Sequence, residues 1–242
     1  MDAVPNLVLA ALPRSVYLEL LPQLAPVTLV FGDVLFELGD SIDHVYFPSA
    51  CLVSLLAVVE SHRALEVGMV GREGMVGLPL ALGVERAPLK ALVQGGGTAM
   101  QMSGPDFVGA LEQHPALRRG VNVCINALMG QVATTAACNR FHAIDARLAR
   151  WLLMTRDRLA SGQFPLTHEF LAGMLGVRRE GVTEAALAFQ QRGLIEYARG
   201  KLVILDHPRL EAAACSCYRQ SPTGIDCIPR WRPEGRRVHL LT

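Results

Sequence analysis

The sequence predicts an α+β protein with a β-rich first half and a helical second half. Residues 27–103 alternate apolar and polar runs that are punctuated by glycines, which is typical of a small antiparallel barrel. An apolar stripe at helical spacing occupies residues 115–137. Two short helical patterns and two strand-like runs then fill residues 165–206. These observations predict a β-roll, a long connecting helix and a compact C-terminal unit.

Composition and charge distribution fit two modest folded domains of different character. Hydrophobic residues make up 51% of the 242 residues, which is ample for folded cores. Residues 1–143 hold 8 Lys and Arg against 12 Asp and Glu, whereas the remainder holds 15 against 10. A basic half beside an acidic half is expected when one domain meets phosphate and the other does not.

The sequence predicts a cytoplasmic protein with no membrane partner. The chain opens with Met-Asp-Ala-Val-Pro and has no basic leader, and its longest obvious apolar stretch, residues 51–59, is too short to span a bilayer. The cysteines are scattered rather than framed, as in a reducing compartment. They are Cys51, Cys124, Cys138, Cys215, Cys217 and Cys227.

The elements before the C-terminal unit follow from local patterns. Residues 7–24 are helical in pattern and are broken by Pro13 and Pro22, which predicts short helices ahead of the roll. The stripe of the long helix faces either a partner helix or the chain's own barrel. Its residues are Leu117, Val121, Cys124, Ile125, Leu128 and Val132. A second helix is expected at residues 139–159, with a hinge at residues 139–143.

Residues 165–206 predict a helix-turn-helix followed by a hairpin. Thr167 is suited to cap a first short helix that Gly176 ends, and a second pattern runs from about Arg178 to Arg192. Two helices joined by a tight glycine turn form the unit whose second helix enters the DNA major groove. Strand-like runs at residues 194–197 and 202–205 flank Arg199 and Gly200, which suit a hairpin turn. An ordinary helical pair packed on a core would give the same spacing.

The residue order T-x-x-x-L-A-x-x-L-G-V-x-R-E-x-V-T, from Thr167 to Thr183, resembles the winged helix-turn-helix of the Crp/Fnr family of bacterial transcription regulators. Residues 32–36 and 44–48 are similar to the opening strands of that family's cyclic-nucleotide-binding jelly roll. The resemblance implies a sensor roll in residues 1–114, a dimerisation helix and hinge in 115–143 and a winged helix-turn-helix in 144–218. Residues 219–242 lack a periodic apolar face, which predicts a flexible tail. The resemblance also implies a homodimer in which the apolar stripe from Leu117 to Val132 pairs with the same helix of the two-fold mate. The expected partners are double-stranded DNA with a near-palindromic operator and RNA polymerase, and the roll has an allosteric role.

The resemblance carries DNA-contacting roles over to particular residues. The family's base-reading pair falls on Arg179 and Glu180, where a guanidinium can bond guanine and a carboxylate can accept from cytosine. Glu184 stands where the cyclic-AMP receptor branch has a second base-reading arginine, so a different operator is expected. The full base-reading set is Arg178, Arg179, Glu180, Thr183 and Glu184. The expected phosphate contacts are Thr167, His168, Glu169, Arg199 and Lys201, although each cation could equally be solvated.

The effector pocket of the family corresponds to residues 72–92. Relatives that bind cyclic AMP hold the ribose with a glutamate and the cyclic phosphate with an arginine. Aligned on Gly74 and Gly77, this chain has Met75 at the carboxylate position, and Arg86 reaches the arginine position only with one inserted residue. A thioether cannot accept the ribose hydrogen bonds as a carboxylate does. Cyclic nucleotide is therefore not expected as a cofactor. The candidate pocket residues are Glu73, Gly74, Met75, Arg86 and Ala87.

Metal and catalytic chemistry are not expected. No cysteine precedes Cys51, which argues against the family's N-terminal iron–sulfur cluster. Cys215 and Cys217 could bind a soft metal or form a redox couple with Cys227, but two thiolates alone make an incomplete zinc site, so inert thiols are expected. No P-loop, nucleophile elbow or paired-carboxylate motif points to an enzyme. The rival to a regulator is a ligand-binding or dimerisation module whose C-terminal domain contacts protein.

Overall fold

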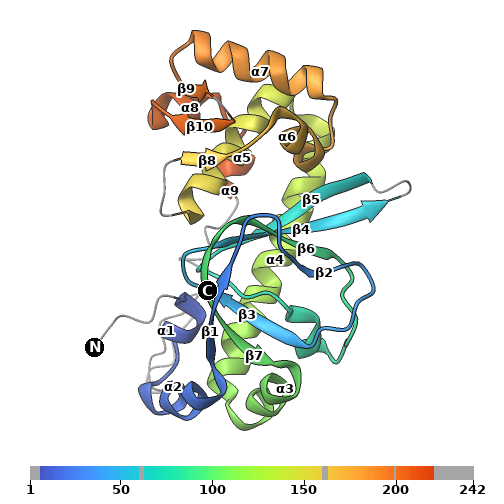
Figure 1. Ribbon diagram of the computed structural model, residues 1–242, viewed down its shortest axis with the longest axis vertical. Helices are drawn as coiled ribbons and strands as arrows, with labels where there is room; N and C mark the ends of the chain where they lie inside the picture. The colour runs from blue at the N-terminus through green and yellow to red at the C-terminus, as the bar shows by residue number, and fades with distance from the viewer. Residues whose placement is uncertain (1–5, 60–62, 160–162, 199, 221–242) are drawn as a thin grey trace, which may run out of the picture.

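The computed structural model describes residues 6–59, 63–159, 163–198 and 200–220. Figure 1 shows a β-roll at one end and a helical domain at the other, with helix α4 (Pro115–Phe141) running lengthwise between them. The predicted order of roll, long helix and C-terminal unit is confirmed.

Short helices precede the roll, as the proline-broken pattern predicts. They are α1 (Leu7–Ala10), α2 (Arg14–Leu20) and the 3-10 helix η1 (Leu21–Gln23). The buried Asn6 caps α1 by accepting hydrogen bonds from the backbone N–H groups of Val8 and Leu9. Its Nδ2 donates to the carbonyls of Pro48 (2.8 Å) and Gly74 (2.9 Å), so one side chain fixes the start of the fold to two segments of the roll.

The roll consists of two antiparallel sheets that enclose one apolar core. Their strand orders are β1-β7-β3 and β2-β6-β4-β5. Gly97 is required where β7 begins, because a Cβ there would lie 2.2 Å from the carbonyl oxygen of Ala50. The bounds are β1 (Ala25–Leu29), β2 (Val34–Phe36), β3 (His44–Pro48), β4 (Leu52–Val59), β5 (Arg63–Val70), the 3-10 helix η3 (Leu78–Leu82), β6 (Lys90–Gly95) and β7 (Gly97–Ser103).

Helix α3 (Gly104–Gln113) leads into α4, whose apolar stripe packs on the chain's own roll. Leu117, Val121 and Cys124 are buried in the roll core, and Ile125 and Leu128 pack against the same core. The assignment of these residues to a partner helix is therefore wrong, because their apolar surface is already covered within the chain; Val132, the last of the set, is half-buried.

A different face of α4 is open to solvent. It combines small residues with two large apolar side chains, Met129 (67% exposed) and Phe141 (76% exposed). This exposed face consists of Asn122, Asn126, Met129, Gly130, Ala133, Ala136, Ala137, Arg140 and Phe141. Among the described helices, α4 is the one whose length and apolar composition would suffice to cross a membrane.

The C-terminal domain begins at α5 (Ile144–Arg158), which residues 142 and 143 separate from α4, within the predicted hinge. The predicted start of this helix at residue 139 is wrong, because residues 139–141 continue α4. Helices α6 (His168–Leu175) and α7 (Arg179–Gln191) follow the predicted pattern, as does the hairpin of β9 (Ile195–Ala198) and β10 (Lys201–Ile204). Local sequence patterns do not predict β8 (Gln163–Pro165), which pairs with β10, or the helices α8 (His207–Ala213) and α9 (Cys217–Gln220). Residues 221–242 of the predicted tail lie outside the described residues, while α9 includes residues 219 and 220.

The two domains share a packed interface. Leu52, Leu56 and Met69 of the roll lie in one apolar cluster with Leu148 and Leu152 of α5. The β4–β5 hairpin also reaches α6 (Figure 1), and a Cβ on Gly176 would lie 2.7 Å from Leu65 Cδ1. The position of the C-terminal domain is therefore fixed by contacts with the second sheet of the roll.

Candidate nucleic-acid interface

Helix α7 exposes the charged half that the sequence predicts. It begins at Arg179, with Arg178 as its N-cap residue, and it lies at the end of the molecule farthest from the roll (Figure 1). Arg178, Arg179, Glu180 and Glu184 are exposed, whereas the opposite face is buried. The buried face consists of Val182, Ala185, Ala186 and Phe189. The first turn of a helix carries partial positive charge, so two arginines there make a strongly cationic end that suits a polyanion.

The turn between α6 and α7 is held by a helix cap, a left-handed glycine and a side-chain hydrogen bond from α5. Thr167 caps α6 by accepting from the N–H of Phe170 (3.0 Å), as predicted, and Gly176 ends α6 in the left-handed region at φ 63°. Arg147 of α5 donates to the carbonyl of Leu175 and to Asn139 Oδ1 of α4 (2.7 Å). This guanidinium satisfies a carbonyl at the end of α6 that the helix itself leaves unpaired.

His168 and Thr183 are engaged inside the domain. The Thr183 hydroxyl donates to the carbonyl of Arg179 (3.0 Å), and His168 Nδ1 lies 3.0 Å from Thr183 Oγ1. The imidazole stacks on Tyr197, with ring centroids 4.6 Å apart, and the Tyr197 hydroxyl donates to the carbonyl of Leu166 (2.8 Å). Burial and the charge of Arg179 lower the pKa of His168. His168 is thus half-buried and neutral, so it joins α6 to α7 and supplies no cation for a phosphate.

Other expected phosphate contacts lie at the surface. Thr167 and Glu169 are exposed at the start of α6, and Lys201 is exposed at the start of β10. The Thr167 oxygen accepts from the backbone, so its hydroxyl proton is available to an external acceptor. Arg199 lies outside the described residues, and Gly200 beside it has φ 74°, which suits the predicted turn.

The predicted effector residues do not form one polar pocket. Glu73 Oε1 lies 2.6 Å from Nε of Arg158 on α5, and Arg86 Nη1 donates to the carbonyl of Gly39 (2.8 Å) at the surface. Gly74 accepts from Asn6, and Met75 and Ala87 are buried apolar residues. The grouping of these five residues as a ligand site is therefore wrong for Glu73, Gly74 and Arg86, whose polar groups bond within the protein.

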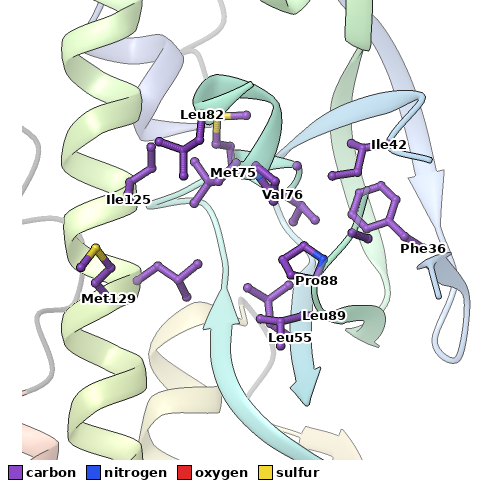
Figure 2. Close-up of a pocket in the computed structure, with 15 residues that line it drawn as sticks. Phe36, Ile42, Leu55, Met75, Val76, Leu82, Pro88, Leu89, Ile125 and Met129 are labelled. Atoms are coloured by element: carbon purple, nitrogen blue, oxygen red, sulfur yellow. The ribbon is translucent and has the colours of Figure 1, made fainter. Parts of the chain in front are cut away.

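An apolar cavity of about 210 Å³ lies beside Met75, between the roll and α4. Figure 2 shows Met75 and Val76 facing Ile125 and Met129 of α4 across it. Every lining residue is apolar or glycine: Phe36, Ile42, Leu55, Met75, Val76, Gly77, Leu78, Pro79, Leu82, Ala87, Pro88, Leu89, Ile125, Leu128 and Met129. Such a lining offers no charged partner to a phosphate and no carboxylate to a ribose.

Polar side chains of the roll reach α5 in three places. Glu66 Oε1 accepts from Trp151 Nε1 (2.9 Å), and Gln94 Nε2 donates to Thr155 Oγ1 (3.2 Å). The Glu73–Arg158 pair is the third contact, and these six residues are called the roll–α5 seam below. Burial raises the pKa of Glu66 to about 7, although hydrogen bonds from Ser54 and Trp151 oppose the shift.

The roll–α5 seam was not anticipated from the sequence. A possible signal was Glu66 itself, a lone carboxylate between Leu65 and Val67 in an apolar strand. Lone charges in such runs are almost never buried without a partner. The identity of that partner, 85 residues away, depends on the tertiary structure.

Comparisons with known proteins agree with this architecture. Residues 146–213 match the family model of the Crp-like helix-turn-helix domain. No curated protein sequence matches the chain significantly. Among solved structures, FixK2 from Bradyrhizobium japonicum is 14% identical with a TM-score of 0.68, covering 80% of this chain and 98% of that chain.

Two further structures extend the likeness. TTHB099, a CRP-family transcriptional regulator from Thermus thermophilus, is 21% identical, has a TM-score of 0.66, and covers 78% of this chain and 96% of that chain. CLP of Xanthomonas campestris, a global regulator described as c-di-GMP responsive, is 16% identical, has a TM-score of 0.65, and covers 80% and 100%. At identities between 14% and 21%, the similarity to these structures establishes the fold of the chain and nothing further.

Residues 146–213 therefore form a Crp-like helix-turn-helix domain, and the chain as a whole shares the fold of these solved regulators.

Proposed function

We propose that the chain is a homodimeric regulator that acts in the cytoplasm and reads a near-palindromic DNA operator with the first half of α7. The observation that carries this proposal is the exposure of Arg178 and Arg179 at a helix N-terminus whose opposite face is buried. A helix that packs on its domain through one face and exposes charged residues on the other can enter a major groove without breaking any packing contact.

Roles for the exposed residues follow from their chemistry. Arg179 donates two hydrogen bonds to guanine, Glu180 accepts from the amino group of cytosine, and Glu184 extends the contact one turn along the groove. Arg178 lies at the edge of this set, and the half-buried Thr183 holds the start of the helix. Thr167 and Lys201 fix the domain on backbone phosphates, together with Arg199 and the backbone at Glu169.

The exposed face of α4 is proposed as the dimer interface. Within its most apolar 18-residue window, with mean hydropathy 1.3, only 28% is buried. Gly130 and Ala133 allow two helices to approach closely, and the exposed Met129 and Phe141 need cover. A two-fold axis along this face would set the two α7 helices about one DNA turn apart.

The roll biases the orientation of the reading heads through the roll–α5 seam. Any displacement of the second sheet must move or break the bonds to Trp151, Thr155 and Arg158. A two-state element of this kind can couple distant sites. The apolar cavity argues that cyclic nucleotide is not the effector, and RNA polymerase is the expected partner once the dimer is on DNA.

The test begins with selection of bound sites from random duplex DNA, with and without cell extract, followed by titration of the selected operator and a scrambled duplex. Arg179→Ala should cost about 1–3 kcal/mol on the operator and relax preference at one base pair of each half-site. Lys201→Ala should weaken both duplexes alike and reduce the salt slope by about one. Arg192→Ala, which removes an exposed arginine at the other end of α7, is the matched control and should bind as the unmodified chain does.

The rival function is a dimerisation or ligand-binding module whose C-terminal domain contacts protein. Under that function no operator is selected, and Arg179→Ala lowers weak binding to operator and scrambled DNA equally. Either result would remove the proposal.

A further inference from the structure

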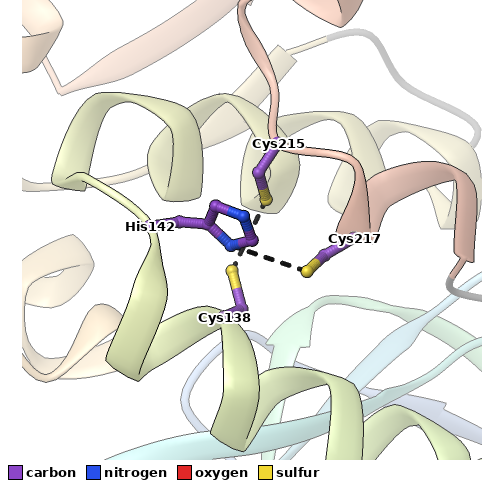
Figure 3. A group of neighbouring side chains, drawn as sticks. All are labelled: Cys138, His142, Cys215 and Cys217. Atoms are coloured by element: carbon purple, nitrogen blue, oxygen red, sulfur yellow. Dashed lines mark hydrogen bonds between the residues drawn. The ribbon is translucent and has the colours of Figure 1, made fainter.

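Three thiols and an imidazole converge where α4 meets the end of the C-terminal domain. Figure 3 shows Cys138 of α4 and His142, the C-cap residue of α4, facing Cys215 and Cys217. Cys215 lies between α8 and α9, and Cys217 is the first residue of α9. Their four ligand atoms all lie within 4.8 Å of one another. The three cysteines are buried, and His142 is half-buried.

The distances match a tetrahedral zinc site. Zinc bonds of about 2.3 Å to sulfur and about 2.0–2.1 Å to nitrogen place two sulfur ligands about 3.8 Å apart, and sulfur and nitrogen about 3.6 Å apart. Cys138 Sγ lies 3.5 Å from Cys215 Sγ, and Cys217 Sγ lies 3.6 Å from His142 Nδ1. Small side-chain adjustments would therefore bring all four atoms onto one ion.

Local structure explains how the ligands are held. Cys138 and His142 are four residues apart, so they share one face of the last turn of α4, where the N–H of His142 donates to the carbonyl of Cys138 (3.1 Å). Cys215 is fixed by its N–H donating to the carbonyl of Ala146 (3.4 Å), and its own carbonyl accepts from Tyr218 (3.0 Å). Both halves of the cluster are thus positioned by backbone hydrogen bonds.

The surroundings suit a cluster of thiolates. A small cavity is lined by Cys138 together with Arg147 and Arg150 of α5, so two buried guanidinium groups lie beside the sulfur atoms. Nε of Arg147 has no hydrogen-bond partner within the described residues. Three thiolates and one Zn²⁺ carry a net charge of −1, which a neighbouring arginine offsets.

We infer that Cys138, His142, Cys215 and Cys217 bind one zinc ion in a closed tetrahedral site. A ligand set of three cysteines and one histidine with no open position is typical of structural zinc. The sequence shows Cys215 and Cys217 as an incomplete pair, and the fold completes it with two residues from 73 or more positions earlier in the chain.

A disulfide between Cys138 and Cys215 explains less of the geometry. It would use two sulfur atoms and leave no role for Cys217 and His142, which converge on the same point. The two sulfur atoms are also 3.5 Å apart, well beyond the bond length of about 2.05 Å.

The site straddles the hinge. Cys138 and His142 precede α5, whereas Cys215 and Cys217 close the C-terminal domain. The ion would therefore clamp the end of α4 to the domain that carries α7, across the short connection at residues 142 and 143. This consequence rests on the proposed function: loss of zinc should free the reading head and weaken operator binding.

The experiment measures metal first and DNA second, on the full chain. Protein expressed with added zinc and purified without chelator should contain about one zinc per chain by mass spectrometry, and Co²⁺ substitution should give the visible absorption of a tetrahedral thiolate site. Two variants should lose the metal: the double variant Cys215→Ala/Cys217→Ala and the single variant His142→Ala. His142→Cys should keep the metal with an altered cobalt spectrum. Cys124→Ala, which removes a cysteine of α4 that is buried in the roll core, should bind metal as the unmodified chain does.

Folding and function are separated by chelation. Removing zinc from the unmodified chain should weaken operator binding at least tenfold while circular dichroism shows the helices retained, and added zinc should restore affinity. The zinc site would be overturned if the folded chain takes up neither zinc nor cobalt, or if the double variant keeps its full metal content. It would also be overturned by a metal-free chain two hydrogens lighter than expected, which indicates a disulfide, or by iron with sulfide in place of zinc. Metal binding without any operator binding would instead overturn the proposed function and leave the site standing.

Discussion

Glu73 of the roll and the buried Arg158 of α5 form an ion pair, with Oε1 and Nε 2.6 Å apart and the Glu73 side chain 12% exposed. The backbone N–H of Gly71 also donates to the same carboxylate oxygen (3.2 Å), and Arg158 Nη1 donates to the carbonyl of Met154 (3.0 Å). Glu73, a candidate effector residue in the sequence, is here part of the contact between domains. Its charge serves orientation of the C-terminal domain and is not available to a ligand.

Glu73→Ala should destabilise the protein by about 3–5 kcal/mol, because it leaves the Arg158 guanidinium buried without its partner. Urea denaturation measures the loss. The double change Glu73→Leu/Arg158→Met should cost less than Glu73→Ala, since no buried charge remains. Glu37→Ala breaks the exposed pair with Lys90 and should cost no more than about 1 kcal/mol. If Glu73→Ala and Glu37→Ala lower the free energy of unfolding equally, the Glu73–Arg158 pair contributes no more to stability than the exposed pair does.

Glu66 should make stability fall as pH rises. Its pKa in the fold is about 7, above the ordinary value of 4.5, so the fold favours the protonated carboxyl. The stabilisation is fully present below pH 4.5 and is lost as pH rises through about 7. The difference corresponds to about 3 kcal/mol at most.

Glu66→Gln imitates the protonated acid, since its amide can still accept from Trp151 and donate toward Ser54. Thermal unfolding from pH 5 to 8 should therefore show a flatter profile for Glu66→Gln than for the unmodified chain. The exposed Glu112→Gln serves as control and should reproduce the unmodified profile. Parallel profiles for Glu66→Gln and the unmodified chain would contradict the raised pKa.

Met75→Glu tests whether a carboxylate at this position suffices for cyclic nucleotide binding. The new side chain would enter an apolar cavity with no cationic lining residue, so we expect a loss of about 3–5 kcal/mol in stability. Calorimetric titration with cyclic AMP should give no binding heat. Arg86→Ala, at the surface, should change stability by no more than about 0.5 kcal/mol. Cyclic AMP binding to Met75→Glu would refute the view that the pocket is built for apolar contact.

Ala133→Glu should dissociate the proposed dimer, because a two-fold interface on the exposed face of α4 would bury the new charge twice. Sedimentation across protein concentrations should show the dimer weakened about tenfold or more. Gln113→Glu, exposed on α3, is the control and should leave the association unchanged.

Leu117→Ala separates the two faces of α4. Leu117 is fully buried in the roll core, so its truncation should lower monomer stability by about 2–5 kcal/mol with no selective effect on association. If Leu117→Ala stays folded but becomes monomeric, Leu117 belongs to the dimer interface and the assignment to the roll core is wrong.

Local patterns in the sequence were enough for the two helices of the helix-turn-helix and for the hairpin after them. Thr167, Gly176 and the spacing of Val182, Ala185 and Phe189 predict the cap, the turn and the buried face of α7, and each is observed. Such features depend on neighbours within about one helical turn, so the chain encodes them directly. The hairpin of β9 and β10 follows from its turn residues in the same way.

The sequence alone determined the two-domain α+β plan, the helix-turn-helix and the charged first half of α7. Only the tertiary structure decided which segments contact one another. The stripe of α4 packs on the chain's own roll, Glu73 pairs with Arg158, and Cys138 and His142 lie beside Cys215 and Cys217. The physical reason is that periodicity records which side of a helix or strand is apolar, whereas the partner of that side is chosen by packing between segments tens of residues apart.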